Sequence, residues 1–313
     1  MAPTIGVDIG GTKVLAVRVD ATGAVLDEDR RPTPRDGEAL LDVVTDLVTG
    51  LRHGSAEPVR VGVGAPGLVD HDGVLRFAPN LRDAEDLPIR TGLECRLPGA
   101  VLRVGNDATY AGWAERTYGA ARGSDHALLV TLGTGIGGGI VAGGQLLEGA
   151  NGYAGEIGHM VVDPNGPPCP CGKRGCWERF ASGSGLGRLA REAAHAGQAQ
   201  RMVELAGGDP EAVRGEHVTQ AAVEGDLQAL EVIGRFAWWL ALGLANLANI
   251  FDPQCFVLGG GLVEAGTVLL DPTRLAFHDL VEAADKRPEV AILLAELGER
   301  AGAIGAAALA REI

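Results

Sequence analysis

The chain has 313 residues, of which 46% are hydrophobic, and it carries a formal net charge of −14. This length and apolar content allow a sizeable core and favour two domains over one. The acidic balance, with a pI near 4.9, argues against a protein that wraps nucleic acid, because neutralising phosphates requires clustered Lys and Arg. An anionic ligand must therefore be bound by a local site, because the overall charge of the protein would repel it.

The N-terminal sequence "MAPTIGVDIGG" has neither the basic region nor the apolar region that a secretory signal carries. We therefore expect a cytoplasmic protein. The longest apolar stretch, from Phe236 to Phe251, contains Asn246 and Asn249 and is shorter than the about 20 residues that span a bilayer. This stretch predicts a buried helix, and no membrane partner is expected.

The first third of the chain alternates short β-rich segments with helical ones, which indicates an α/β protein. The predicted strands cover residues 4–11, 13–20, 24–30, 59–67 and 100–107, and the predicted helix covers 38–54. The sequence "DATG" from Asp20 predicts a tight turn that joins two strands. The chain should therefore open as a β-meander, where a doubly wound Rossmann domain would have a helix.

An approximate repeat relates "VDIGGTKVLAVRVD" from Val7 to "VTLGTGIGGGIVAGG" from Val130. Each copy predicts a strand, a Gly/Thr turn and a second strand. Two such hairpins indicate two related lobes facing across a cleft, with glycine turns that let backbone N–H groups approach phosphate oxygens. A pair of ordinary glycine-rich hairpins is the alternative reading.

Other glycine motifs exclude two common nucleotide sites. Gly62–Gly67 and Gly133–Gly138 both match G-x-G-x-x-G, but neither opens a helix as the dinucleotide fingerprint requires. The sequence "GGTK" is not a Walker A loop, because Thr precedes Lys. If phosphate is bound, another architecture binds it.

The second half is predicted to be strongly helical from Gly185 to about Ile250. A last strand, "CFVLGGGL", ends in Gly259, Gly260 and Gly261, where bare backbone could admit a flat ring such as adenine; a simple tight turn fits equally. The final "RAGAIGAAALARE" predicts an Ala-rich helix that packs back on the first lobe.

Three of the five cysteines lie within "CPCGKRGCWE". Cys169, Cys171 and Cys176 have the spacing C-x-C-x4-C, which lets three thiolates meet one tetrahedral ion, and His159 stands ten residues upstream as a fourth ligand. We predict a closed and therefore structural Cys3His zinc site; unpaired thiols in a Pro/Gly loop are the alternative. Cys95 and Cys255 are predicted to be small core residues.

Asn106 and Asp107 directly follow the apolar segment "AVLRV", where an α/β strand delivers side chains into a cleft. A carboxylate in that place could act as a general base. Asp107 could instead simply cap the helix that follows it. The residues alone leave both readings open.

Taken in order, "DIGGTK", "GVGAPG", "ND", "LGTGIGGGI", "GANGYAGEIGHM", "CPCGKRGCWE" and "VLGGGL" resemble the ROK family of sugar kinases, and within it the bacterial ATP-dependent glucokinases. The resemblance covers essentially the whole chain. A zinc knuckle preceded by E-x-x-H is specific to that family, unlike any of the glycine motifs alone.

The resemblance implies an α/β fold of the actin-like ATPase (ribonuclease-H-like) type, with two lobes around a central cleft. Residues 1–107, joined by a C-terminal helix at 299–313, would form the small lobe, and residues 108–298 the large lobe with the zinc knuckle. The implied reaction is ATP-dependent phosphorylation of glucose to glucose 6-phosphate, with Mg²⁺ as cofactor.

The resemblance also implies roles for individual residues. Asp107 would take the proton from the sugar's 6-hydroxyl, and Asp8 would help to orient the magnesium. The remaining roles would be phosphate binding by Gly10, Gly11, Thr12, Lys13, Gly133, Thr134 and Gly135, adenosine contacts by Gly259, Gly260 and Gly261, and sugar contacts by Asn80, Asn106, Asp107, Glu156, His159 and Glu178. The zinc would hold His159 and Glu178 around the sugar.

Two departures from the family pattern leave open which hexose is the substrate. Charged residues follow Asn80 where the family often has an aromatic residue, and Gly105 stands where the family frequently has Glu. Glucose leads, and N-acetylmannosamine, mannose and fructose are alternatives.

A sugar-responsive repressor would carry a helix-turn-helix extension before the first phosphate motif, whereas Asp8 stands almost at the start of this sequence. A non-catalytic sugar-binding regulator is disfavoured by Asp107. We expect a homodimer, or a tetramer, formed through the apolar helices of the second lobe.

Overall fold

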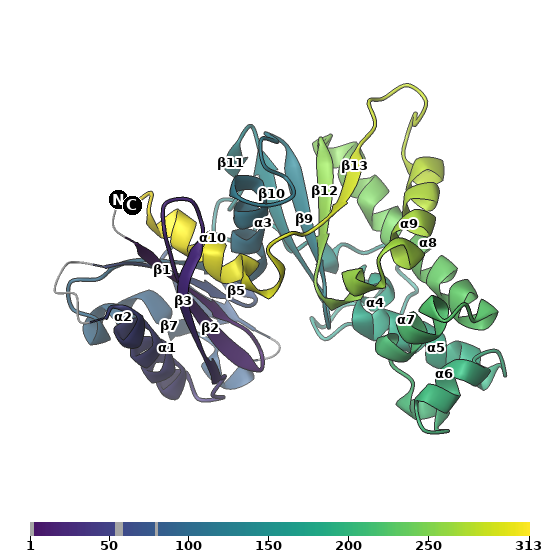
Figure 1. The fold of residues 1–313 in the computed structure, drawn as a ribbon, viewed down its shortest axis with the longest axis horizontal. Coiled ribbons are helices and arrows are strands. Elements are labelled where there is room, and N and C mark those ends of the chain that lie inside the picture. The colour runs from purple at the N-terminus through teal and green to yellow at the C-terminus, as the bar shows by residue number, and fades with distance from the viewer. Residues whose placement is uncertain (1–2, 54–58, 79–80) are drawn as a thin grey trace. The chain divides into compact units, whose positions relative to one another are not determined.

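The computed structural model describes residues 3–53, 59–78 and 81–313 (Figure 1). Contacts divide the chain into two units. Unit 1 comprises Met1–Leu129, Gly139–Gly155 and Ala295–Ile313, and unit 2 comprises Val130–Gly138 and Glu156–Leu294. The lobe boundary after residue 107 stays a prediction, and the description below follows these two units.

Unit 1 is built on a five-stranded mixed sheet with the strand order β3-β2-β1-β4-β8. Its strands are β1 Thr4–Ile9, β2 Lys13–Val19, β3 Val25–Pro32, β4 Arg60–Ala65 and β8 Val101–Asn106. Its helices are α1 Gly37–Leu51, α2 Ile89–Arg96, α3 Asp107–Thr117 and α10 Ala301–Ala310, and a small sheet consists of β5 Leu68–Val69, β6 Val74–Phe77 and β7 Leu87–Pro88.

The predicted β-meander is confirmed. β1, β2 and β3 pair antiparallel in chain order, whereas β1, β4 and β8 pair in parallel. The turn between β2 and β3 is held by Asp20, whose Oδ1 accepts the backbone N–H groups of Thr22 at 2.8 Å and Ala24 at 3.0 Å. An Asp side chain that bonds the backbone two residues ahead is the mechanism by which this residue favours turns.

Alternate residues of the central strands face opposite sides of the sheet, as the period of a strand requires. One set packs with α1 in the main core of unit 1: Ile5, Val7 and Ile9 of β1, and Val61, Val63 and Ala65 of β4. The other side carries glycine where α10 crosses it. A Cβ on Gly6 would overlap the carbonyl oxygen of Ala303, and one on Gly62 would overlap that of Ala306.

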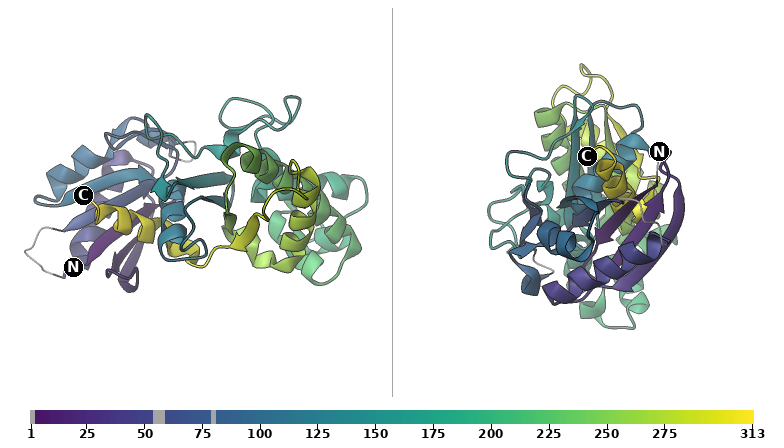
Figure 2. Two further views of the ribbon diagram at one scale, coloured as in Figure 1. Left: turned by 90° about the horizontal axis from the view of Figure 1, so that it is seen from above. Right: turned by 90° about the vertical axis from the view of Figure 1, so that its left-hand side faces the viewer.

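The fully buried helix α10 therefore lies directly on backbone, and Figure 2 shows it across the face of the sheet. The first turn of α10 lies against Asp8: a Cβ on Gly302 would lie 2.9 Å from the carboxyl carbon of Asp8. Glycine and alanine make this approach possible, because a larger side chain would hold the helix away from the sheet. The last helix thus supports the strand end that carries Asp8.

A second five-stranded sheet has the order β11-β10-β9-β12-β13. Its strands are β9 Ala127–Leu132, β10 Ile136–Ala142, β11 Gln145–Leu146, β12 Cys255–Gly259 and β13 Ala291–Leu294. The helices of unit 2 are α4 Glu178–Ala181, α5 Gly183–His195, α6 Gln200–Leu205, α7 Gly215–Val223, α8 Leu227–Phe251 and α9 Thr267–Leu280. The second predicted hairpin is present as β9 and β10.

The expectation that "CFVLGGGL" is the last strand is wrong. β13 follows it and pairs in parallel with β12, with Cys255 opposite Ala291. β13 has only four residues and lies at the sheet edge, and its partner strand is more than thirty residues earlier in the chain. Sequence periodicity over such a short segment is too weak to indicate a strand.

The apolar stretch that ends at Phe251 belongs to α8. Among the described residues, α8 is one helix that is long and apolar enough to cross a membrane, and half of its most apolar window is buried inside the protein. Its buried side includes Phe236, Leu240 and Leu244, which recur at helical spacing. The prediction of a helix that packs in the core is confirmed.

The two isolated cysteines differ. Cys255 is buried in β12, as predicted. Cys95 is exposed, so its assignment to the core is wrong. It lies on α2, a short helix whose buried residues are Ile89 and Leu93. The outward position of Cys95 follows from which side of α2 packs, and not from the residue type.

Candidate active site

The first glycine turn joins β1 to β2. The N–H of Gly10 donates to the carbonyl of Lys13 at 2.9 Å, and Thr33 braces the turn from outside. The Thr33 hydroxyl donates to the carbonyl of Gly10 at 2.7 Å, and its N–H donates to the carbonyl of Thr12 at 3.1 Å. Gly11 and Thr12 are exposed at the tip. The turn is fixed at its base and open at its tip, as a phosphate-binding turn requires.

Lys13 forms an ion pair with Glu299, a residue 286 positions away that precedes α10. Arg30 of β3 also pairs with Glu299, at 3.2 Å. These partners hold the lysine ammonium beside the strand that carries Asp8, and its positive charge lowers the pKa of Asp8. Lys13 is therefore an electrostatic neighbour of the buried carboxyl groups.

Asp8 is a partly buried acid near the end of β1. Burial is the main cause that raises its pKa to about 7, and the negative charge of Asp107 raises it further, against the smaller opposing effect of Lys13. Two carboxyl groups in a low-dielectric site disfavour ionisation of each other. A divalent cation would offset both burial and repulsion, so the residues present fit magnesium.

Asn106 and Asp107 stand at the corner where β8 becomes α3. The N-cap of α3 is Asn106, whose Oδ1 accepts the N–H of Thr109 at 2.9 Å and whose Nδ2 donates to the carbonyl of Gly67 at 3.1 Å. The reading of Asp107 as a simple helix cap is therefore wrong. Asp107 is the first helical residue, and one of its oxygens accepts the N–H of Ala108 at 2.8 Å. Burial raises its pKa.

In unit 2 the predicted metal ligands come together. His159, Cys169, Cys171 and Cys176 place one ligand atom each within 4.8 Å of one another. The Sγ atoms of Cys171 and Cys176 are 3.6 Å apart, and Cys169 Sγ is 3.7 Å from His159 Nδ1. Ligands at about 2.3 Å around a tetrahedral zinc lie about 3.7 Å from each other. The cluster thus fits a structural zinc.

The knuckle geometry leaves the second nitrogen of His159 available. Nδ1 faces the thiols, whereas Nε2 lies 3.7 Å from a carboxylate oxygen of Glu156. One imidazole can therefore bind the metal with one nitrogen and serve a ligand with the other, as metal-bound histidines commonly do. Glu178 lies on the opposite side of the ring, 3.9 Å from Nδ1 and 3.2 Å from Cys169 Sγ.

Trp177 anchors the end of the knuckle to α8. Its side chain is fully buried, its Nε1 donates to the carbonyl of Trp239 at 2.8 Å, and a Cβ on Gly243 would overlap its ring. The next residue is Glu178, so this anchor sets the position of the Glu178 carboxylate. One Glu178 oxygen lies 3.5 Å from the N–H of Ile136, directly after the second glycine turn. Glu178 thus links the knuckle to that turn.

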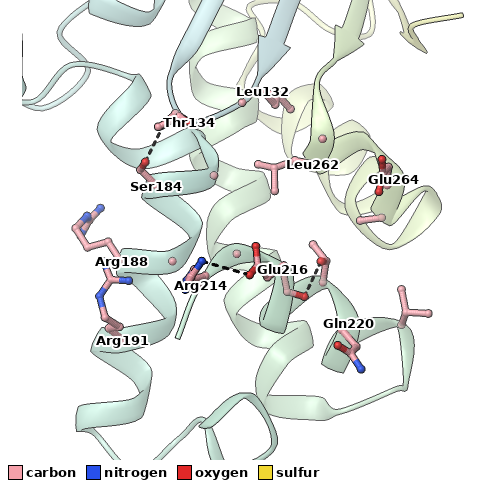
Figure 3. A pocket seen from close by; sticks show the side chains of 18 of the residues that line it. Leu132, Thr134, Ser184, Arg188, Arg191, Arg214, Glu216, Gln220, Leu262 and Glu264 are labelled. Atoms are coloured by element: carbon pink, nitrogen blue, oxygen red, sulfur yellow. Dashed lines mark hydrogen bonds and ion pairs between the residues drawn. The ribbon is translucent and has the colours of Figure 1, made fainter. Parts of the chain in front are cut away.

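The second glycine turn, at residues 133–135, is braced by the start of α5. The N–H of Gly183 donates to the carbonyl of Gly133 at 2.8 Å, and the Ser184 hydroxyl donates to the carbonyl of Thr134 at 2.8 Å (Figure 3). Gly260 lies against Leu132, the last residue of β9. It has a φ of 85°, and a Cβ there would lie 2.5 Å from the carbonyl oxygen of Leu132. These contacts bring the 133–135 turn next to the end of β12.

Beside this turn a pocket of about 970 Å³ opens within unit 2. Figure 3 shows Thr134 and Leu132 at one end and Leu262 across from them, with Arg188 and Arg191 on α5 and Arg214 before α7. The lining includes Gly133, Thr134, Arg179, Ser184, Arg188, Arg191, Arg214, Glu216, Gln220, Gly261, Leu262 and Glu264. The volume and the mixture of apolar, polar and cationic side chains suit a nucleoside with phosphates.

The structure thus gathers the predicted residues in two groups. Unit 1 holds Asp8, Gly10, Gly11, Thr12, Lys13, Asn106 and Asp107, and unit 2 holds Gly133, Thr134, Gly135, Glu156, His159, Glu178, the three zinc cysteines and Gly259, Gly260 and Gly261. Of Gly259, which ends β12, and the two glycines that follow it, Gly261 lines the pocket. Asn80 lies outside the described residues.

Sequence reasoning missed the arginine and serine side chains of the pocket. Ser184, Arg188, Arg191 and Arg214 come from α5 and from the residue before α7. The sequence "SGSGLGR", which starts at the α5 N-cap Ser182, is a local signal that could have drawn attention to this helix start. The approach of α7 could not be read from the sequence.

Comparisons with known proteins agree with this geometry. The ROK family model matches residues 4–313. The glucokinase of Streptomyces coelicolor is 41% identical over 315 residues, covering 100% of this chain and 98% of that one. An N-acetylmannosamine kinase of Escherichia coli O9:H4 is 37% identical over 320 residues, covering 98% of each chain.

Among solved structures, a ROK family glucokinase from Streptomyces griseus in complex with glucose and AMPPNP superposes with a TM-score of 0.87, at 41% identity over 100% of both chains. The predicted fold class, an actin-like ATPase fold, is confirmed. The zinc knuckle, the two glycine turns and the match over nearly the whole length lead to one conclusion: the chain belongs to the ROK family.

Proposed function

We propose that this protein is an ATP-dependent glucokinase that transfers the γ-phosphoryl group to the 6-hydroxyl of glucose. One observation carries the proposal: Asp107 is a partly buried carboxyl group at a strand end that the helix does not use as its cap. The likeness to glucokinases over the full length supports the same reaction.

Asp107 is the general base. Burial raises its pKa toward the working pH, which is the range in which a carboxylate transfers protons efficiently. The hydrogen bond from the N–H of Ala108 keeps one carboxylate oxygen oriented, and the other oxygen remains for the sugar hydroxyl. The proton of the 6-hydroxyl passes to Asp107 as the sugar's O6 attacks the γ-phosphorus, and the bond from that phosphorus to the bridging oxygen of ADP breaks.

The two glycine turns hold the phosphates, and the pocket behind the second turn holds the adenosine. When bound with ATP, Mg²⁺ neutralises charge on the phosphates, and Asp8 is the carboxylate that orients it. Phosphoryl transfer needs positioning and charge neutralisation more than covalent help, and backbone N–H groups with a nearby lysine supply both. Lys13 contributes the positive charge on the side of β1.

Glucose is held through its hydroxyls by Asn80, Asn106, Glu156, His159 and Glu178. The Nε2 of His159 points away from the thiols, toward Glu156, and so can reach a ligand. Paired polar groups discriminate strongly between epimers, because a sugar with one inverted hydroxyl leaves a buried group unpaired.

We propose a cytoplasmic protein that forms a homodimer. Leu227, Leu230 and Trp238 lie along one side of α8 and are 79%, 38% and 43% exposed. An exposed apolar row on a long helix suits a self-complementary contact. Light scattering at micromolar concentration checks the oligomeric state.

A coupled ATP assay of the purified protein on glucose, N-acetylmannosamine, mannose and fructose tests the function. The expected result is Mg²⁺-dependent turnover with the highest kcat/KM on glucose. N-acetylmannosamine is included because of the similarity to the E. coli N-acetylmannosamine kinase. A higher kcat/KM on N-acetylmannosamine than on glucose would make N-acetylmannosamine the proposed substrate. No turnover above a no-enzyme control on any sugar would overturn the kinase assignment.

A further inference from the structure

Gly105 and Tyr110 meet at the corner where β8 becomes α3. Gly105 is the residue before Asn106 and Asp107, and Tyr110 lies one helical turn after Asp107. A Cβ added to Gly105 would lie 2.5 Å from the hydroxyl oxygen of Tyr110 and 2.7 Å from the carbon that carries it. The tyrosine ring therefore occupies the space that any side chain at position 105 would need.

The ring of Tyr110 has no room to move aside. It is fully buried and packs with Ala306 and Leu309 of α10. A Cβ on Gly305 would overlap the carbonyl oxygen of Tyr110, so α10 lies directly against this part of α3. The backbone of α3 and the ring are both held from the side opposite the corner.

The corner is also packed from the neighbouring strand. Gly64 of β4 stands in register with Gly105, and a Cβ on Gly64 would lie 3.1 Å from the Cα of Asp107. The corner that contains Asp107 is thus packed by β4 on one side and by Tyr110 on the other. A displacement at Gly105 must be passed on to Asp107, two residues later.

Burying the hydroxyl of Tyr110 in this position costs free energy of folding. The hydroxyl is buried without a hydrogen bond of good geometry among the residues that the structure describes, and Arg103 is the side chain that is placed to bond it. The charged groups near it are Arg103 and Glu148, which form an ion pair at 2.9 Å, and Arg90. A phenylalanine would avoid the cost of burying the hydroxyl, so packing alone does not account for tyrosine here.

We infer that Tyr110 is a positioning residue for Asp107, and that its ring and hydroxyl, wedged against Gly105, set the angle at which β8 turns into α3. This inference rests on the proposed role of Asp107 as the general base. Its physical basis is that transfer of a proton and a phosphoryl group tolerates little misplacement: a shift of about 1 Å can cost about 10²-fold in rate.

The test compares Gly105→Ala, Tyr110→Phe and Tyr110→Leu with Leu309→Ala. Leu309 lies in the same buried cluster but not at the corner, so it is the matched control for lost packing. Gly105→Ala should lower kcat by about 10-fold or more with a smaller change in glucose KM. Tyr110→Leu shortens the side chain facing position 105, so Gly105→Ala should cost less kcat in that background than in the wild type.

Two readouts separate positioning from stability. The acid limb of the pH profile of kcat reports Asp107 in the working enzyme. The pKa of Asp107, followed by NMR in protein with ¹³C-labelled aspartate and no substrate, reports the same group independently of any sugar. The acid limb of the pH profile and the Asp107 pKa measured by NMR should both shift in Gly105→Ala and in Tyr110→Phe. Neither quantity should shift in Leu309→Ala, although the Tm of that variant falls.

The inference is overturned if the Gly105 and Tyr110 variants keep the wild-type kcat, pH profile and Asp107 pKa, as Leu309→Ala is expected to do, whatever their Tm. If Gly105→Ala does not fold, the two Tyr110 variants decide by the same criteria. Failure of the proposed function is distinguishable, because it would show as absent turnover in the wild type while the NMR comparison still reports on the corner.

Discussion

Asp107 raises the pKa of Asp8, because both carboxyl groups are partly buried in unit 1 and their negative charges repel each other. A protein retains such a pair at a cost in stability, since each group would ionise more easily in water. The pair is thus a functional feature that stability measurements can detect.

The contribution of Asp8 to the stability of the ligand-free protein should fall as the pH rises from about 4 to about 7. Asp8 has a pKa of about 7 in the folded protein, against about 3.9 in an unfolded chain. The folded state therefore binds this proton more tightly, and its contribution to stability is present below about pH 4 and lost as the pH rises through about 7. Differential scanning fluorimetry across this range measures it.

Asp8→Asn is the control for that experiment, because the amide has no proton to lose. The difference in Tm between wild type and variant should grow in favour of the variant as the pH rises. A difference that stays constant from pH 4 to pH 8 would mean that Asp8 ionises at the pH expected in water.

Asp107→Asn should lower kcat by about 10² to 10⁴ while glucose still binds, because an amide can form hydrogen bonds but cannot accept the proton. Stopped assays give kcat, and calorimetry gives glucose affinity. Asp46→Asn is the matched control, because it removes an exposed carboxyl group of α1 that has no role in the proposed site. Near-wild-type kcat in Asp107→Asn would remove Asp107 from the chemistry.

The knuckle should contain about one zinc per chain, and Cys171→Ser should lose it, because a neutral hydroxyl replaces a thiolate poorly. His159 and Glu178 would then lose their support, and glucose KM should rise by about 10-fold to 100-fold with less effect on ATP KM. Elemental analysis, a thermal melt and steady-state kinetics on the same preparation are the measurements.

Cys95→Ser serves as the matched control for the zinc experiment. Cys95 is exposed on α2 and lies outside the cluster, so this variant should keep its zinc and its glucose KM. Wild-type protein without zinc, or a folded Cys171→Ser protein with unchanged glucose KM, would refute the assignment.

Gly302→Ala should reduce kcat while leaving the protein folded. The added methyl carbon would lie 2.9 Å from the carboxyl carbon of Asp8, and the carboxyl group is the part that must move. The matched control is Gly234→Ala, a helical glycine of α8 with open space around its Cα. That substitution should stabilise the protein by about 1 kcal/mol without affecting kcat. Equal kcat in both variants would mean that Asp8 tolerates displacement.

Several features of the molecule follow from short stretches of sequence. The β-meander, the turn at Asp20, the two glycine hairpins and the Cys3His cluster each depend on residues within about ten to twenty positions of one another. Turn chemistry, strand period and metal-ligand spacing act over such distances, so the residue types determine them. The long apolar pattern of α8 likewise predicted a helix with one side in the core.

Other features depended on which surfaces meet. Asn106 and not Asp107 caps α3, because the backbone of Asn106 is extended, with φ −75° and ψ 140°, and Asp107 is already helical. Glu115 of α3, which is 1% exposed, accepts the backbone N–H groups of Glu296 and Leu297, 181 and 182 residues away, at 3.1 and 2.9 Å. β13 and the pocket arginines are of the same kind. Such contacts join segments far apart in the chain, and the burial of one face against another selects them, which no local pattern records.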